Sequence, residues 1–163
     1  MSEYRERILK TLGDRPVVAT LEATGARVEA LAARLGAAGM RRSVAPGKWT
    51  AQQILAHLAD AEIGVGFRLR QALAEDDHQA QAFDQDRWAA RYGGLKADGV
   101  AAARAFCALR PWNVALIRTL TPKDLARTFY HPERGTESVD LIVKMLAGHD
   151  LNHLAQLEQI AAQ

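Results

Sequence analysis

His149 and His153 lie four residues apart within an apolar stripe near the C-terminus of this 163-residue chain. The stripe consists of residues that recur at steps of three and four, the period of one helix face: Ile142, Met145, Leu146, His149, His153, Leu157 and Ile160. An imidazole buried without a partner costs free energy, so two of them on a core face need an explanation. Side chains at i and i+4 have Cβ atoms about 5–6 Å apart, close enough for both rings to bind one metal ion.

A metal site of this kind needs a further protein ligand, because catalytic zinc ions usually have three such ligands and one open position. His57 is the strongest candidate, since it borders the apolar face of an expected helix. Asp60 and Glu62 follow it in the chain and could orient or bind an ion, although a solvated helix face is the simpler interpretation of both. On spacing alone, a pair of satisfied core histidines fits H-x-x-x-H as well as a metal site does.

The other residues with reactive side chains give weaker signals. Asp150 stands where the zincin motif H-E-x-x-H has its general base, but nothing else of that motif is present and we reject a zincin. We predict that His131, which precedes a proline, lies on the surface of a turn, and that His78, in an acidic stretch, is exposed to solvent. Cys107 is the single cysteine, and we predict that it packs as a small hydrophobic residue.

The composition is that of one globular domain spanning residues 1–163, with 48% hydrophobic and 25% charged residues. A formal charge of +2 gives no argument for nucleic-acid or membrane binding. One cysteine excludes a disulfide within the chain and fits a reducing compartment. We find neither the apolar core of a signal peptide nor a run of about 20 apolar residues, and expect a cytoplasmic protein.

The periodicity predicts helices and no convincing strand. A capping box, Thr50 with Gln53, marks the start of one helix, and Pro111 should kink another. Residues 76–97 are expected to form an irregular crossover with at most one helical turn, and residues 130–135 a turn. Glu137 and Asp140 are expected in the first turn of the last helix. The four expected helices cover residues 16–35, 50–75, 100–120 and 137–161, with a short one at 3–12. This is an all-α chain, a four-helix bundle with a long crossover connection.

Three segments form a combination more specific than any one motif. They are Pro46–Glu62, with Trp49 and the run H-L-A-D-A-E from His57; H-P-E-R-G at 131–135; and H-D-L-N-H-L-A-Q-L at 149–157. Together they resemble the DinB/YfiT-like superfamily of metalloenzymes, over nearly the whole chain from about residue 16 to 160. The resemblance implies a four-helix bundle whose metal ligands are His57, His149 and His153.

The resemblance also implies a metal and two reactions. The ion would be a divalent transition metal, with zinc as the first expectation and nickel, iron or manganese as alternatives. It would activate either a low-molecular-weight thiol, as in an S-transferase acting on an electrophile, or water, as in a hydrolase. Asp60 and Glu62 are the candidates for orienting a ligand; no residue of the sequence identifies a catalytic base or a thiol pocket.

Two alternatives remain open from the sequence. A non-enzymatic metal-binding stress or interaction protein is favoured by the lack of a visible general base, and would have a fourth protein ligand such as Glu62 or His131. A metal-free bundle with satisfied histidines is the other. The resemblance further implies a homodimer, and nothing in the chain resembles a nucleic-acid module.

Overall fold

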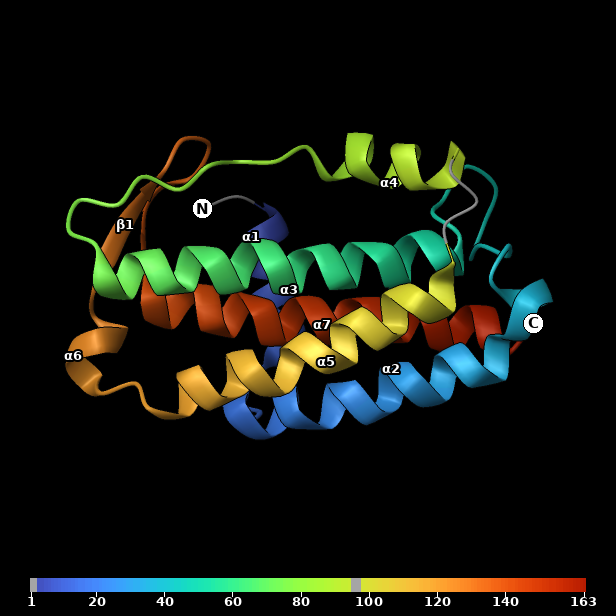
Figure 1. Ribbon diagram of the computed structural model, residues 1–163, viewed down its shortest axis with the longest axis horizontal. Coiled ribbons are helices and arrows are strands. Elements are labelled where there is room, and N and C mark those ends of the chain that lie inside the picture. Colours follow the sequence, from blue (N-terminus) through green and yellow to red (C-terminus); the bar gives the residue numbers. More distant parts are fainter. Residues whose placement is uncertain (1–2, 95–97) are drawn as a thin grey trace.

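The computed structural model describes residues 3–94 and 98–163, and four long helices form its body (Figure 1). These are α2 (Val17–Gly39), α3 (Ala51–Ala74), α5 (Gly99–Arg118) and α7 (Val139–Ala161). Contacts between α2 and α5, α5 and α3, α3 and α7, and α7 and α2 close the four into a ring. The short helix α1 (Glu3–Leu12) packs against α7. The predicted all-α four-helix bundle is confirmed.

Side chains cap the starts of the helices that carry the histidines. The backbone N–H of Thr50 donates to Gln53 Oε1 at 2.9 Å, as the predicted capping box requires. Ser138 precedes α7, and its hydroxyl accepts from the Leu141 N–H at 3.1 Å. Each cap gives a partner to a backbone group that the first helical turn leaves unpaired. The caps therefore fix where α3 and α7 begin.

A polar layer crosses the bundle between two apolar clusters. One cluster contains Leu31, Leu58, Phe106 and Leu157, and the other Leu21, Leu69, Val114 and Leu146, among further residues. Each long helix contributes to both clusters, and between its two contributions it carries buried polar residues. The layer includes Thr24 of α2, Glu62 of α3, Arg110 of α5 and Asp150 of α7.

The expectation that the chain contains no strand was wrong. The strands β1 (Thr128–His131) and β2 (Gly135–Ser138) form an antiparallel hairpin in which His131 pairs with Gly135. Strands of four residues are too short to give a clear alternation in the sequence. Since α7 begins at Val139, Glu137 lies in β2 and not, as expected, in the first helical turn.

The crossover between α3 and α5 is more regular than expected. It contains α4 (Gln85–Gly94), a ten-residue helix where at most one turn was predicted. Gln53 on α3 donates to the Ala89 carbonyl at 3.1 Å and ties α4 to the bundle. Residues 95–97, the end of the predicted crossover, lie outside the described residues. Beyond them, α5 continues through Pro111 as one helix, and α6 (Pro122–Leu125) follows it.

By length and composition, α5 could cross a membrane. It has 20 residues and a mean hydropathy of 1.2. No apolar run of this length was expected from the sequence. The helices at the core of a soluble protein can meet the same criteria, and α5 packs against both α2 and α3. It is therefore a helix of the bundle.

Candidate metal centre

The bundle brings together the three histidines named as metal ligands. His57 extends from α3, and His149 and His153 extend from α7. One ring nitrogen from each lies within 4.8 Å of the other two. The Nε2 atoms of His57 and His149 are 2.8 Å apart, and the centroids of the His149 and His153 rings are 4.4 Å apart.

All three histidines are buried, and burial lowers the pKa of two of them, His57 and His153. It lowers the pKa of His57 to about 2, with smaller contributions from the neighbouring His149 and His153. Burial, followed by the influence of His149, lowers the pKa of His153 to about 3. A neutral imidazole has the lone pair that a metal ion needs, so these two rings are in the ligating form at neutral pH.

The nitrogen positions fit a divalent transition metal. Two nitrogens bound at about 2.0–2.1 Å to a tetrahedral ion are about 3.3 Å apart. His57 and His149 therefore need to separate by about half an ångström from their 2.8 Å contact. Among the described residues, the buried Nδ1 of His149 has no hydrogen-bond partner, so the cluster does not satisfy itself.

Two further side chains hold the rings in place. His153 Nδ1 is 2.8 Å from Gln156 Oε1; since a carbonyl oxygen only accepts, this contact fixes the proton on Nδ1 and leaves the Nε2 lone pair free for a ligand bond. Trp49 packs edge-on against His57, with the centroids 4.9 Å apart, and stacks on His153 at 6.2 Å. Gln156 and Trp49 both belong to the motifs that carry the resemblance, but neither of them was assigned a role at the site from the sequence.

An ion-pair network in the polar layer lies behind the histidines. Arg110 donates to Asp150 Oδ2 at 2.5 Å and to Glu62 Oε1 at 2.6 Å. Asn113 donates to Glu62 Oε2 at 3.0 Å, and Thr24 donates to Asp150 Oδ2 at 3.1 Å. Burial alone raises the pKa of Asp150, but the Arg110 guanidinium outweighs it and holds that pKa below its usual value. The network of Arg110, Glu62 and Asp150 therefore contains two carboxylates and one guanidinium.

Asp150 is the residue that sequence reasoning missed. Its Oδ1 has no hydrogen-bond partner among the described residues and lies 3.8 Å from His149 Nδ1. The excess negative charge of the network thus faces the histidine cluster, an arrangement that favours a cation there and orients His149. The signal in the sequence was the position of Asp150 directly after His149. From the sequence, Asp150 was considered only as a possible general base.

The solvated helix face preferred for Asp60 and Glu62 was wrong, since both are buried. Glu62 contacts Arg110 and Asn113 and makes no recorded contact with a histidine of the cluster. It supports the layer behind the site. The position of Glu62 in the sequence could not reveal these contacts, because Arg110 is 48 residues away.

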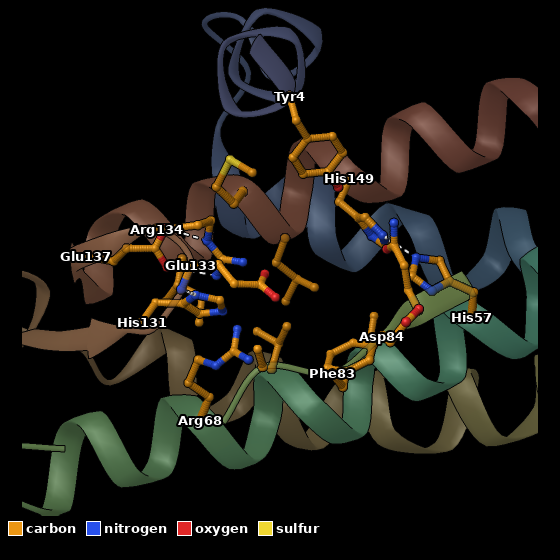
Figure 2. Close-up of a pocket in the computed structure, with 17 residues that line it drawn as sticks. Tyr4, His57, Arg68, Phe83, Asp84, His131, Glu133, Arg134, Glu137 and His149 are labelled. Atoms are coloured by element: carbon orange, nitrogen blue, oxygen red, sulfur yellow. Dashed lines mark hydrogen bonds and ion pairs between the residues drawn. The ribbon is translucent and has the colours of Figure 1, made fainter. Parts of the chain in front are cut away.

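A cavity of about 570 Å³ opens beside the cluster (Figure 2). His57 and His149 line one end, and His131, Arg68 and Arg134 line the other. The surface position predicted for His131 was wrong, because it is 1% exposed.

Two other predictions concern residues away from the cavity. His78 is buried, so the predicted solvent exposure was wrong. Cys107 packs against an apolar cluster as predicted, and its thiol donates to the Gly25 carbonyl at 3.4 Å.

Comparison with known proteins finds similar chains. The protein named "Putative metal-dependent hydrolase OB0782" from Oceanobacillus iheyensis is 31% identical over 114 residues, which are 70% of this chain and 66% of that protein. "Putative metal-dependent hydrolase YfiT" from Bacillus subtilis is 26% identical over 116 residues, 71% of this chain and 65% of its own. The chain thus spans slightly less than two thirds of the length of these relatives. The solved structure of YfiT matches with a TM-score of 0.83 at 22% identity, covering 90% of this chain and 84% of that one, which shows the four-helix-bundle fold.

Fold and site together define a class: four-helix-bundle proteins with a three-histidine cluster in the core. Within this class, a sequence profile described as the DinB superfamily matches residues 20–157. The chain belongs to the DinB superfamily. Among its described residues, the cluster of His57, His149 and His153 could hold a metal ion.

Proposed function

We propose that the protein is a metal-dependent enzyme in which His57, His149 and His153 hold a divalent transition metal beside the substrate cavity. The observation that carries the proposal is a buried cluster of three imidazoles, two of which, those of His57 and His149, line a cavity of about 570 Å³. A divalent ion held by neutral ligands would lower the pKa of a bound water or thiol towards neutrality. Such a cavity has the size of small-molecule sites.

The surrounding residues would prepare the ligands for that ion. Asp150 faces His149 Nδ1 and would accept its proton, which fixes the tautomer that leaves Nε2 available. Gln156 has the same role for His153. The apolar part of the cavity wall, with Ala61 and Leu146, would limit the water around a bound substrate.

A closed, purely structural metal site is less well supported. It requires a fourth protein ligand, and the candidates were Glu62 and His131. Glu62 is held by Arg110 and Asn113, and His131 lines the end of the cavity away from the cluster. Neither candidate for a fourth protein ligand is therefore placed at the cluster, and such a ligand is the feature that would favour the non-enzymatic alternative.

The nucleophile is proposed to be water or a low-molecular-weight thiol. The names of the relatives favour hydrolysis, and the resemblance described above favours an S-transferase that joins a thiol to an electrophile. Zinc is proposed as the ion, because it accepts imidazole, water and thiolate; nickel, iron and manganese are the alternatives.

Elemental analysis of the untagged protein tests the site, and turnover tests the enzyme. We expect about one transition-metal ion per chain after reconstitution. The loaded protein is then assayed with ester and amide probes, and with thiols plus an electrophile. Hydrolysis without added thiol identifies water as the nucleophile, whereas strictly thiol-dependent turnover identifies the transferase. A loaded protein inactive in every assay contradicts the enzyme and leaves the metal-binding alternative.

We further propose that two copies associate through the outer face of α3 and α5. Ile63, Phe67 and Trp112 are large apolar side chains on these helices, and Trp112 is 67% exposed. Arg70 lies over the Trp112 ring at 5.7 Å, so the indole lies against the same stretch of α3. Light scattering should give a dimer mass for the natural chain and a monomer mass for Trp112→Glu; a natural chain that is already monomeric contradicts this.

We also propose a cytoplasmic location. The single cysteine is a free thiol that packs in the bundle, which suits a reducing compartment. Fractionation of cells that express the full-length protein tests this, and recovery in a membrane or extracellular fraction contradicts it.

A further inference from the structure

The cavity extends along two helices away from the histidines. On α3 its wall is formed by His57, Ala61, Val65 and Arg68, at steps of four, four and three residues. Since a helix rises 1.5 Å per residue, the backbones of His57 and Arg68 are about 16 Å apart along the axis. On α7 the wall continues from His149 through Leu146 and Met145 to Ile142. The cavity thus has a histidine end, an apolar middle and an end at Arg68.

Arg68 is a buried cation whose recorded hydrogen-bond partner is a neutral carbonyl. It is 7% exposed, and its guanidinium donates to the Gln81 carbonyl at 3.0 Å. No ion pair is recorded for it with any of the described residues. Burying a guanidinium is costly unless a carboxylate or similar anion compensates its charge. A neutral carbonyl gives only part of that compensation.

The buried carboxylate nearby is already shared. Glu137 receives Arg134 at 2.8 Å and 2.9 Å, and it also receives Arg5 at 2.9 Å. The guanidinium groups of Arg134 and Arg5 thus already share the single negative charge of Glu137. Burial and the charge of Arg134 both lower the pKa of Arg68, with only partial relief from Glu137. The positive charge at this end exceeds the buried negative charge.

Two other carboxylates line the cavity, and both are exposed. Asp84 lies 3.3 Å from Arg87, and its other oxygen accepts backbone N–H groups at the start of α4. Glu133 extends into the opening of the cavity (Figure 2), and no ion pair within 4.0 Å is recorded for it among the described residues. Solvent screens both charges, so neither replaces a buried partner for Arg68.

His131 offers a second donor beside Arg68 (Figure 2). Its Nδ1 accepts the backbone N–H of Glu133 at 3.2 Å, so the proton of the neutral ring is on Nε2. Burial first, then the charges of Arg134 and Arg68, lowers the pKa of His131, so the ring is neutral. A neutral Nε2–H and a guanidinium are the donors that suit a carboxylate.

We propose that this end of the cavity binds a carboxylate of the substrate through Arg68 and His131. The substrate class is therefore an elongated organic acid, with a carboxylate at one end, an apolar middle segment and the reacting group at the histidine end. The position of the reacting group rests on the proposed function; the carboxylate site rests on Arg68 and His131 alone.

The carboxylate site is tested first on metal-free protein, with hexanoate and the neutral hexanamide as probes. We expect hexanoate to bind the natural chain about ten-fold or more tightly than hexanamide, the range of a charge-assisted hydrogen bond. In Arg68→Gln this preference should disappear while hexanamide binds as before. Titration followed by NMR gives both affinities, and the Arg68 Nε–Hε signal should shift with hexanoate only.

Two control variants sharpen this test. Arg34→Gln removes the same charge from an exposed position on α2 and should keep the preference. Glu133→Gln removes a negative charge from the opening and should tighten hexanoate several-fold without changing hexanamide. This variant leaves Arg68 in place, so it remains informative where Arg68→Gln does not fold. Equal binding of the two probes by the natural chain, or no response to Glu133→Gln, overturns the carboxylate site.

A second arm connects the two ends of the cavity. Protein loaded with cobalt(II) is titrated with ω-mercaptocarboxylates of increasing chain length and with alkanethiols of equal length, and the thiolate absorption band is followed. A molecule that reaches both ends gains affinity from the second contact only when its length fits. We expect one chain length at which the acid binds at least ten-fold more tightly than its alkanethiol. If no metal binds, the proposed function fails while the hexanoate result still decides the carboxylate site.

Discussion

The polar layer and the histidine cluster are adjacent buried polar regions with opposite character. In the polar layer, Arg110 connects Glu62 and Asp150 through hydrogen bonds of 2.6 Å and 2.5 Å, so opposite charges meet. In the cluster, His57 and His149 bring two nitrogen atoms to 2.8 Å, and groups of the same kind meet. The two carboxylates of the layer share a cation that the protein itself supplies, whereas the cluster needs a ligand from outside.

This difference distinguishes residues that stabilise the bundle from residues that are candidates for function. A buried ion pair whose two charged groups contact each other is compatible with a purely structural role. Neutral imidazoles beside an unsatisfied carboxylate oxygen and an open cavity have no structural benefit of comparable size. Asp150 belongs to both regions, since one of its oxygens contacts Arg110 and the other faces His149.

Breaking the polar layer should have the largest effect on stability. Arg110→Met leaves Glu62 and Asp150 buried without their cation, and we expect the free energy of unfolding to fall by about 3–5 kcal/mol. Urea unfolding of metal-free protein measures this. The matched control is Arg118→Met on the same helix, where an exposed ion pair with Glu22 should contribute less than about 1 kcal/mol. Equal losses in the two variants would show that the layer does not carry the stability assigned to it.

Removing a histidine of the cluster should abolish metal binding with little loss of fold. His149→Ala leaves two candidate ligands, and we expect the metal affinity to fall by at least 100-fold in a chelator competition. The control is His78→Ala, which removes another buried histidine, one outside the cluster. It should keep its metal. Metal retained by the His149 variant, or absent from the natural chain after reconstitution, contradicts the proposed centre.

The sequence predicted the cluster better than its surroundings. The spacing of His149 and His153 lies within one helix, where period alone fixes the common face, and the resemblance supplied His57. Arg110 and Asp150 are 40 residues apart and meet through helix packing, which no local pattern encodes. The hairpin was missed for a similar reason: its strands have four residues each, and residues 130–135 were predicted as a turn without strands. His131 was predicted at the surface because it precedes a proline in that turn, and His78 because it lies in an acidic stretch, yet tertiary packing buries both.

Separating the two functions of Asp150 sharpens the comparison further. Asp150→Asn keeps an oxygen for Arg110 but removes the charge that faces His149, and we expect the metal affinity to fall by about 10–100-fold. Glu62→Gln changes the same network on the side of Asn113 and should lower stability while leaving the metal affinity within about three-fold. Isothermal titration with zinc and urea unfolding of both variants give the two quantities. Equal losses of metal affinity would remove the special role of Asp150.

The last prediction concerns the pH dependence of the stability of the metal-free protein. Burial lowers the pKa of His57 to about 2 and that of His153 to about 3, whereas an unfolded histidine titrates near 6.5. Between about pH 6.5 and 3 the unfolded state therefore binds more protons, and the folded state loses stability as the pH falls. Each of the two histidines should contribute a slope of about 1.4 kcal/mol per pH unit, with no contribution above their unfolded pKa.

The comparison of the natural chain with His57→Gln isolates this contribution, because all other titrating groups are common to both. The unfolding free energy of the metal-free natural chain, minus that of the variant, should fall by about 1.4 kcal/mol for each pH unit below 6.5. Asp150 has the opposite type of shift from an unfavourably buried acid, since the Arg110 guanidinium holds its pKa below the usual value. Parallel curves for the two proteins would mean that His57 takes up its proton at the same pH in the folded and unfolded states, and that burial does not lower its pKa.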